Sequence, residues 1–193
     1  MPASAAEELP AIFTHADARA RGVADRDLYR WRDGGQIEQL ARGIYTKPGI
    51  PVDADLVEIA VRAPFATLCM MTALARHGLI DDIPPTIDAA LPRRQRPPRT
   101  TAPVTWHRFD EDTFTIGRDV MPVYDELTIG IYSTARSIVD AFRLRHLYGE
   151  DQAVAALRRW LAKPGNQPAE LLAVARHFPA AQPSLVRVLQ VLL

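Results

Sequence analysis

The chain has 193 residues, 48% of them hydrophobic, which suits one medium-sized domain or two small ones with their own cores. Lysine plus arginine and aspartate plus glutamate balance at 23 each, which excludes a strongly basic coat for nucleic acids, so any DNA contact must come from a local patch. The single cysteine, Cys69, excludes an intrachain disulfide. With no signal-peptide pattern and no apolar run of about 18 residues, we expect a cytoplasmic protein without membrane contact.

The first 50 residues contain short helical patterns followed by two short extended runs. Thr14 and Asp17 have the spacing of a capping box, which opens a helix. Pro10 ends an earlier helical pattern, and a pair of glycines ends a later one. The predicted elements are helices at residues 4–9, 14–21 and 25–33 and extended runs at residues 36–40 and 43–47.

Helix, turn, helix and hairpin in this order predict a winged helix-turn-helix, a unit that usually places its second helix in the DNA major groove. Arginine side chains can contact guanine edges, while tyrosine and lysine side chains can hold phosphates. We therefore predict DNA contacts by the residues of these types on helix 25–33 and on the hairpin. They are Arg26, Tyr29, Arg30, Arg32, Arg42, Tyr45 and Lys47.

Other features of the same unit favour a different use. Asp25 and Asp27 suit the first turn of a helix but repel phosphates, and acidic and basic side chains balance over residues 1–50. The alternative is a structural winged helix that contacts protein. Tyr45 is equally well explained as an ordinary strand residue.

A linker rich in proline and glycine at residues 48–51 predicts a domain boundary. We expect a winged helix-turn-helix domain at residues 1–50 and a C-terminal domain at residues 51–193. The fold class is α+β, with a mixed α/β second domain and a helical C-terminal tail. The predicted helices after the boundary are 53–62, 65–77, 133–146, 150–162, 168–177 and 183–193, and the predicted strands are 87–91, 104–109, 114–116, 120–123 and 126–132.

Residues 92–99 carry the strongest run of charge, and their prolines predict an extended, exposed segment. Such a segment can hold DNA phosphates or an acidic protein surface, and the alternative is a solvated loop. The candidate contact residues are Arg93, Arg94, Arg96 and Arg99.

The sequence contains none of the common catalytic motifs. Residues 107–110 read His-Arg-Phe-Asp and resemble a kinase catalytic loop only superficially, because they fall on a predicted strand and its end and no glycine-rich phosphate loop or Asp-Phe-Gly accompanies them. The five histidines are scattered and form no local metal site. We expect a protein that is not an enzyme and uses no cofactor or metal.

Four stretches carry a resemblance to a known family. The first is Gly22–Arg30, followed by Gly35 and Arg42–Tyr45, and the second is Thr72–Leu79, which is similar to the family pattern Ser-Ala-Leu-x-x-His-Gly-Leu. The third is the predicted strand at residues 87–92 with the arginines that follow it and residues 104–108. The fourth is Ser133–Asp140, which is similar to the family pattern Pro-x-Arg-Thr-Leu-x-Asp. In this order they resemble the AbiEi antitoxin family of type IV toxin–antitoxin systems.

The resemblance implies a winged helix that binds and represses the promoter of its own operon, and a C-terminal antitoxin domain. It also implies a cognate toxin that resembles a nucleotidyltransferase and is countered directly or indirectly. Three alternatives stay open: a stand-alone transcriptional regulator, a kinase-like enzyme that modifies the toxin, and a protein-binding antitoxin with a vestigial winged helix. The matched segments Thr72–Leu79 and Ser133–Asp140 have a structural explanation, because they hold core residues and Arg136 with Asp140 forms an i,i+4 pair.

Overall fold

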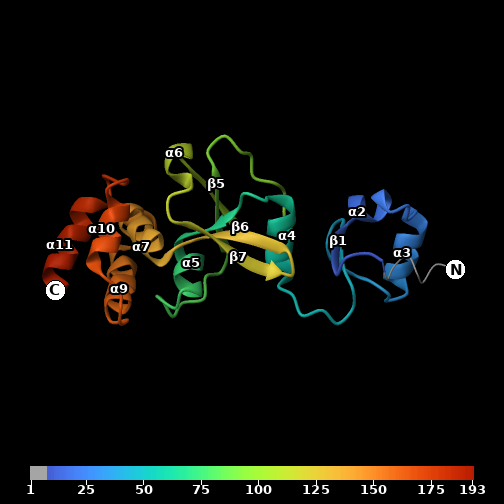
Figure 1. The fold of residues 1–193 in the computed structure, drawn as a ribbon, viewed down its shortest axis with the longest axis horizontal. Helices are drawn as coiled ribbons and strands as arrows, with labels where there is room; N and C mark the ends of the chain where they lie inside the picture. The colour runs from blue at the N-terminus through green and yellow to red at the C-terminus, as the bar shows by residue number, and fades with distance from the viewer. Residues whose placement is uncertain (1–7) are drawn as a thin grey trace.

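The computed structural model describes residues 8–193 and shows an α+β protein, which confirms the predicted fold class. Within these residues the chain forms ten helices and two sheets. Figure 1 shows three parts along the longest axis: a small N-terminal unit, a central sheet with helices, and a bundle of C-terminal helices. The predicted helix at residues 4–9 lies outside the described residues except for its last two positions, which are not helical.

The N-terminal unit has the predicted element order. It consists of β1 (Ile12–Thr14), α2 (His15–Ala20), α3 (Asp25–Asp33), β2 (Glu38–Ala41) and β3 (Ile44–Thr46), with β3 in the middle of an antiparallel sheet. The predicted capping box is present, because Thr14 Oγ1 accepts a hydrogen bond from the Asp17 amide and the Asp17 carboxylate accepts one from the Thr14 amide. Leu28 and Trp31 of α3 pack into a core with Phe13 and Ile37. The winged helix-turn-helix assignment remains a prediction.

The central part is a five-stranded mixed sheet with the strand order β6-β5-β4-β8-β7. Its elements are α4 (Ala54–Arg62), β4 (Thr67–Leu68), α5 (Met70–Arg76), β5 (Ile87–Pro92), β6 (Val104–Phe109), α6 (Glu111–Phe114), β7 (Arg118–Tyr124) and β8 (Leu127–Tyr132). Asp53 caps α4 as its position predicts, by accepting a hydrogen bond from the Leu56 amide. Leu56 and Ile59 of α4 pack against Leu68 and Ile129 of the sheet.

Two predicted elements of the central part are wrong. Residues 67 and 68 form a buried strand between β5 and β8, where a longer helix was predicted. A short apolar run cannot distinguish a buried strand from a helix, and here two neighbouring strands supply the hydrogen bonds. Residues 114–116 are not a strand, because the Asp110 side chain accepts a hydrogen bond from the Asp112 amide and starts the short helix α6 instead.

Four of the five C-terminal helices pack around one apolar core. The five helices are α7 (Thr134–Arg143), α8 (Arg145–Tyr148), α9 (Glu150–Leu161), α10 (Pro168–Ala175) and α11 (Gln182–Leu192). The short helix α8 contributes no buried residue to this core. Phe142, Leu157, Trp160 and Leu185 are buried in this core. Pro168 and Pro183 lie in the first turns of their helices, as predicted, where the missing amide hydrogen costs little. The predicted helix at 133–146 is divided at Leu144 into α7 and α8.

Candidate nucleic-acid interface and its support

Helix α3 presents a polar face opposite its buried side. Leu28 and Trp31 point into the core, whereas Arg26, Tyr29 and Arg30 are exposed. The Arg32 guanidinium lies over the Tyr29 ring, 5.1 Å from its centroid, which orders both side chains. Three of the four α3 residues predicted to contact DNA are exposed, and Arg32 is half-buried.

Carboxylates accompany the arginines of α3. Arg30 Nη2 lies 2.7 Å from Asp27 Oδ1, and Arg26 Nε lies 4.0 Å from the same oxygen. Arg32 pairs with Asp33 at 2.8 Å. Exposed pairs of this kind contribute little to stability, so phosphates can replace the carboxylates as partners of the arginines. The carboxylates remain nearby, however, and reduce the attraction for an anion.

The hairpin residues differ in accessibility. Arg42 is exposed and Lys47 is half-buried. Tyr45 is only 2% exposed and stacks on Phe13, with ring centroids 5.7 Å apart. The predicted DNA contact of Tyr45 is therefore wrong, because its side chain belongs to the core. This agrees with the alternative that Tyr45 is an ordinary strand residue.

The turn of this hairpin is held against α4. Arg62 Nη2 donates a hydrogen bond to the Arg42 carbonyl at 2.7 Å, and Arg62 Nε pairs with Glu58 at 2.8 Å. Beside these bonds, Ala41 and Ile44 of the hairpin are buried against Val57 of α4. The other oxygen of Glu58 accepts hydrogen bonds from two amides just before β6, both at 2.8 Å, from Thr101 and Ala102. The buried Glu58 carboxylate thus links α4 to the end of the connection that carries the arginine segment.

The arginine segment at residues 93–99 is exposed, as predicted, but it does not form a purely basic surface. Arg93 Nη2 lies 3.9 Å from Asp110, and Arg94 Nε lies 3.6 Å from Glu111. Arg96 and Arg99 are also exposed. A mixed-charge surface of this kind suits a protein partner at least as well as a phosphate backbone.

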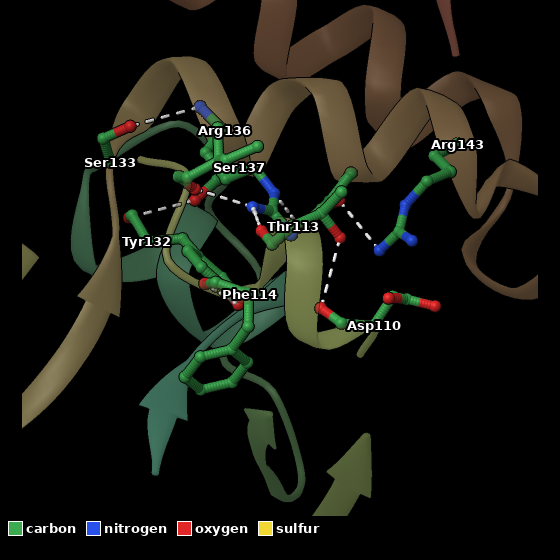
Figure 2. A network of polar contacts seen from close by, with 10 residues as sticks. Asp110, Thr113, Phe114, Tyr132, Ser133, Arg136, Ser137 and Arg143 are labelled. Carbon is green, nitrogen blue, oxygen red and sulfur yellow. Dashed lines mark hydrogen bonds and ion pairs between the residues drawn. The ribbon is translucent and has the colours of Figure 1, made fainter. Parts of the chain in front are cut away.

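A buried network around Arg136 supports the central sheet and was only partly predicted (Figure 2). Arg136 and Asp140 are both fully buried and pair at 2.9 Å, which confirms the i,i+4 pair expected from the sequence. Arg136 Nη1 donates to the carbonyls of Thr113 and Ile116, at 2.8 and 2.6 Å. Its guanidinium also lies 4.2 Å from the ring centroid of Tyr132.

These contacts connect α7 to α6 and to the turn after it. The Tyr132 hydroxyl donates to the Phe114 carbonyl at 2.9 Å, and burial raises the pKa of this hydroxyl, which keeps it protonated as a donor. The network satisfies backbone carbonyls of a short helix that has few bonds of its own. We assign it a structural role, as the sequence indicates for Ser133–Asp140.

Residues 107–110 do not form a catalytic loop. His107 lies on β6 and its Nε2 is 2.8 Å from Asp88 Oδ1, while the Tyr148 hydroxyl is 3.1 Å from the same oxygen. Asp110 caps α6. Within residues 8–193, no group of three His, Cys, Asp or Glu side chains is placed to hold a metal ion.

One family model matches the N-terminal unit. The family model described as "Transcriptional regulator, AbiEi antitoxin" matches residues 3–46, which confirms the AbiEi resemblance for this unit. The comparison with curated proteins gives no match. Over the described part of the chain, no helix is long and apolar enough to span a membrane.

The fold as a whole is similar to a solved structure, the crystal structure of the RV2827C protein from Mycobacterium tuberculosis. The TM-score is 0.65 at 18% sequence identity, with 97% of this chain and 74% of that chain covered. At this identity the likeness concerns the fold alone. It supports the order of an N-terminal unit followed by a larger part.

Proposed function

We propose that this protein is the antitoxin of a type IV-like toxin–antitoxin pair and represses its own operon. In this proposal residues 1–50 bind promoter DNA and residues 51–193 counteract a nucleotidyltransferase-like toxin. The observation that carries the proposal is that the unit matched by the AbiEi antitoxin model presents α3 with Arg26, Tyr29 and Arg30 on its exposed face.

The proposed DNA contacts follow from accessibility. Arg26 and Arg30 extend from the exposed face of α3, where arginine can bind guanine edges or phosphates. Arg32 is held beside Tyr29, and Arg42 and Lys47 flank the hairpin strand β3, at positions suited to the DNA backbone. Arg93, Arg94, Arg96 and Arg99 provide a second surface for DNA phosphates or for a protein partner.

The proposed role requires binding and no chemical step, so the protein is proposed not to be an enzyme. A repressor must also share a compartment with its operon, and the cytoplasmic location is therefore part of the proposal. The toxin can be countered by direct contact or indirectly.

A reporter assay combined with toxin co-expression tests the proposal. The wild-type protein should repress a reporter driven by its own upstream DNA and should restore growth of cells that express the cognate toxin. The variant Arg26/Arg30/Arg32→Ala should lose repression and keep neutralisation, because α3 and the antitoxin part are separate. A wild-type protein that neither represses nor restores growth would overturn the proposal.

A further inference from the structure

A pocket of about 330 Å³ lies beside the arginine segment, between the start of β4 and α6. Its walls include Phe65, Pro92, Gln95, Phe114 and Arg118, and we call it the Phe65 pocket. Gln95 of the arginine segment is one of its walls, whereas no residue of α3 or of the β2–β3 hairpin lines it. Its volume is at the lower end of the range of small-molecule sites, about 300–1,000 Å³.

Much of the pocket wall is apolar. The Phe65 side chain is 58% exposed, which is unusual for a large aromatic residue, and Phe114 is only 4% exposed. Together with Pro92, these side chains provide surfaces for a flat ring or a compact apolar group. An exposed aromatic residue beside a pocket gains the most from a ligand that removes it from water.

One cation in the pocket is held in place without a carboxylate partner. Arg118 Nε donates to Thr67 Oγ1 at 2.8 Å, and among the described residues no carboxylate lies within ion-pair distance of Arg118. Its guanidinium lies against Gly130, where a Cβ atom would be 2.6 Å from Nη2. The absence of a side chain at Gly130 therefore makes room for the guanidinium. A fixed guanidinium with free donors is suited to a carboxylate.

The other charged wall residue is already paired. Glu111 lines the pocket and lies 3.6 Å from Arg94 outside it. Asp110 and Asp112 line the neighbouring pocket together with Glu111. The three carboxylates oppose any anion but oppose a phosphate dianion more strongly than a monoanion, so of these two the electrostatics favour the singly charged carboxylate.

Buried hydrogen bonds hold one side of the pocket in place. Its α6 wall is fixed from behind by the buried network of Figure 2, in which Arg136 and Tyr132 bind the carbonyls of Thr113, Phe114 and Ile116. A rigid wall reduces the entropy that a ligand loses in ordering its site.

We propose that the Phe65 pocket binds a small aromatic carboxylate. The ring lies between Phe65 and Phe114, and the carboxylate pairs with Arg118. This site is separate from α3 and adds a small-molecule ligand to the function proposed above.

Phenylacetate is a suitable probe, used with the full-length protein in ligand-observed and amide-shift NMR titrations. A ligand of this size should bind with a dissociation constant on the order of 1 mM. Phenylacetamide, which has the same ring but no charge, should bind about tenfold more weakly or worse. Phe65→Ala and Arg118→Met should each weaken phenylacetate binding about tenfold.

Ile83→Ala is the matched control, because Ile83 is 92% exposed and lies outside the pocket. This variant should bind phenylacetate like the wild type. Circular dichroism checks the fold of each variant, and Phe65→Ala keeps the test valid if Arg118→Met does not fold. The proposal would be overturned if phenylacetate and phenylacetamide bound equally, or if Phe65→Ala bound phenylacetate like the wild type. It would also be overturned if phenylacetate did not bind at a concentration about ten times the expected dissociation constant. Binding by a Phe-Glu peptide but not by phenylacetate would likewise overturn it, in favour of a protein partner.

Discussion

Arg62 of α4 donates a hydrogen bond to the backbone carbonyl of Arg42, in the turn between β2 and β3. The hairpin turn that a winged unit usually offers to DNA is thus bound by a helix of the same chain. Glu58, which is 2% exposed, pairs with Arg62 and completes the connection. The Arg42 side chain remains exposed, so the turn backbone is fixed while the proposed phosphate contact stays available.

Removing the Arg62 guanidinium should loosen this connection. Arg62→Met keeps the apolar stem but leaves the Arg42 carbonyl and one oxygen of Glu58 without their partner, at a cost of about 1–3 kcal/mol. We expect faster cleavage between residues 47 and 53 in limited proteolysis followed by mass spectrometry. Arg76→Met is the control, because within residues 8–193 the only ion pair of Arg76 is an exposed one with Asp53, at 3.5 Å, next to the same segment. Equal cleavage of both variants would show that the Arg62 bond does not hold the turn.

Glu58 should contribute a pH-dependent part of the stability. Burial alone would raise its pKa, but hydrogen bonds from the Ala102 amide, Arg62 and the Thr101 amide outweigh burial and keep the pKa below the usual 4.5. A carboxylate whose pKa is lower in the folded state stabilises the protein at pH values above its unfolded-state pKa. This stabilisation is lost as the pH falls through the folded-state pKa. Glu58→Gln should therefore be less stable than the wild type at neutral pH, by a difference that shrinks below pH 4.5. Urea unfolding across this range measures it, and a difference independent of pH would contradict the account.

The buried pair of Arg136 and Asp140 should be sensitive to loss of one partner. Arg136→Met leaves the Asp140 carboxylate in an apolar core with only Arg143 beside it, and should destabilise the protein by about 3–5 kcal/mol. Arg136→Met/Asp140→Leu removes both charges and should recover part of that loss, since Arg143 is partly exposed and can turn toward water. Thermal unfolding of the three proteins tests this. A double variant less stable than the single one would contradict this expectation and would mean that Asp140, through its pair with Arg143, still stabilises the fold when Arg136 is absent.

Asp27 should oppose DNA binding. It lies 2.7 Å from Arg30 and beside Arg26, so Asp27→Asn frees two cations and removes a charge that repels phosphates. We expect DNA affinity to rise about threefold, the equivalent of a weak surface pair. Asp125→Asn is the control, because it makes the same charge change in the β7–β8 turn of the central sheet. A titration with labelled DNA measures the affinity of both variants. If both substitutions raised the affinity equally, the increase would reflect the net charge of the protein and not a DNA contact at α3.

Local patterns in the sequence predicted local structure well. The capping box at Thr14 and the cap at Asp53 depend on residues within one helical turn, and the span of α3 depends on nearby residues of the helix and its ends. The buried strand at residues 67 and 68 was missed because its hydrogen-bond partners come from distant strands.

For the candidate sites too, features set by nearby residues could be predicted and those set by distant residues could not. The exposed arginines of α3 follow from the helical period around Leu28 and Trp31. The burial of Tyr45 depends on Phe13, and that of Arg136 depends on residues of α6 and on Tyr132. The docking of the hairpin on α4 depends on Arg62, twenty residues after Arg42. Such contacts carry no signal in a single sequence, because residue type alone does not show which distant segment packs nearby.

The most direct test of the proposed function is a comparison of binding to the protein's own upstream DNA and to a scrambled duplex, at two salt concentrations. The account predicts specific, salt-sensitive binding that Arg26/Arg30/Arg32→Ala abolishes, with the slope of log affinity against log salt reduced by about 0.9 for each lost phosphate contact. Arg158/Arg176/Arg187→Ala removes the same charge from exposed positions on the C-terminal helices and should bind like the wild type. Equal affinity of the wild type for both duplexes, or equal losses in the two triple variants, would contradict a DNA-reading role for α3.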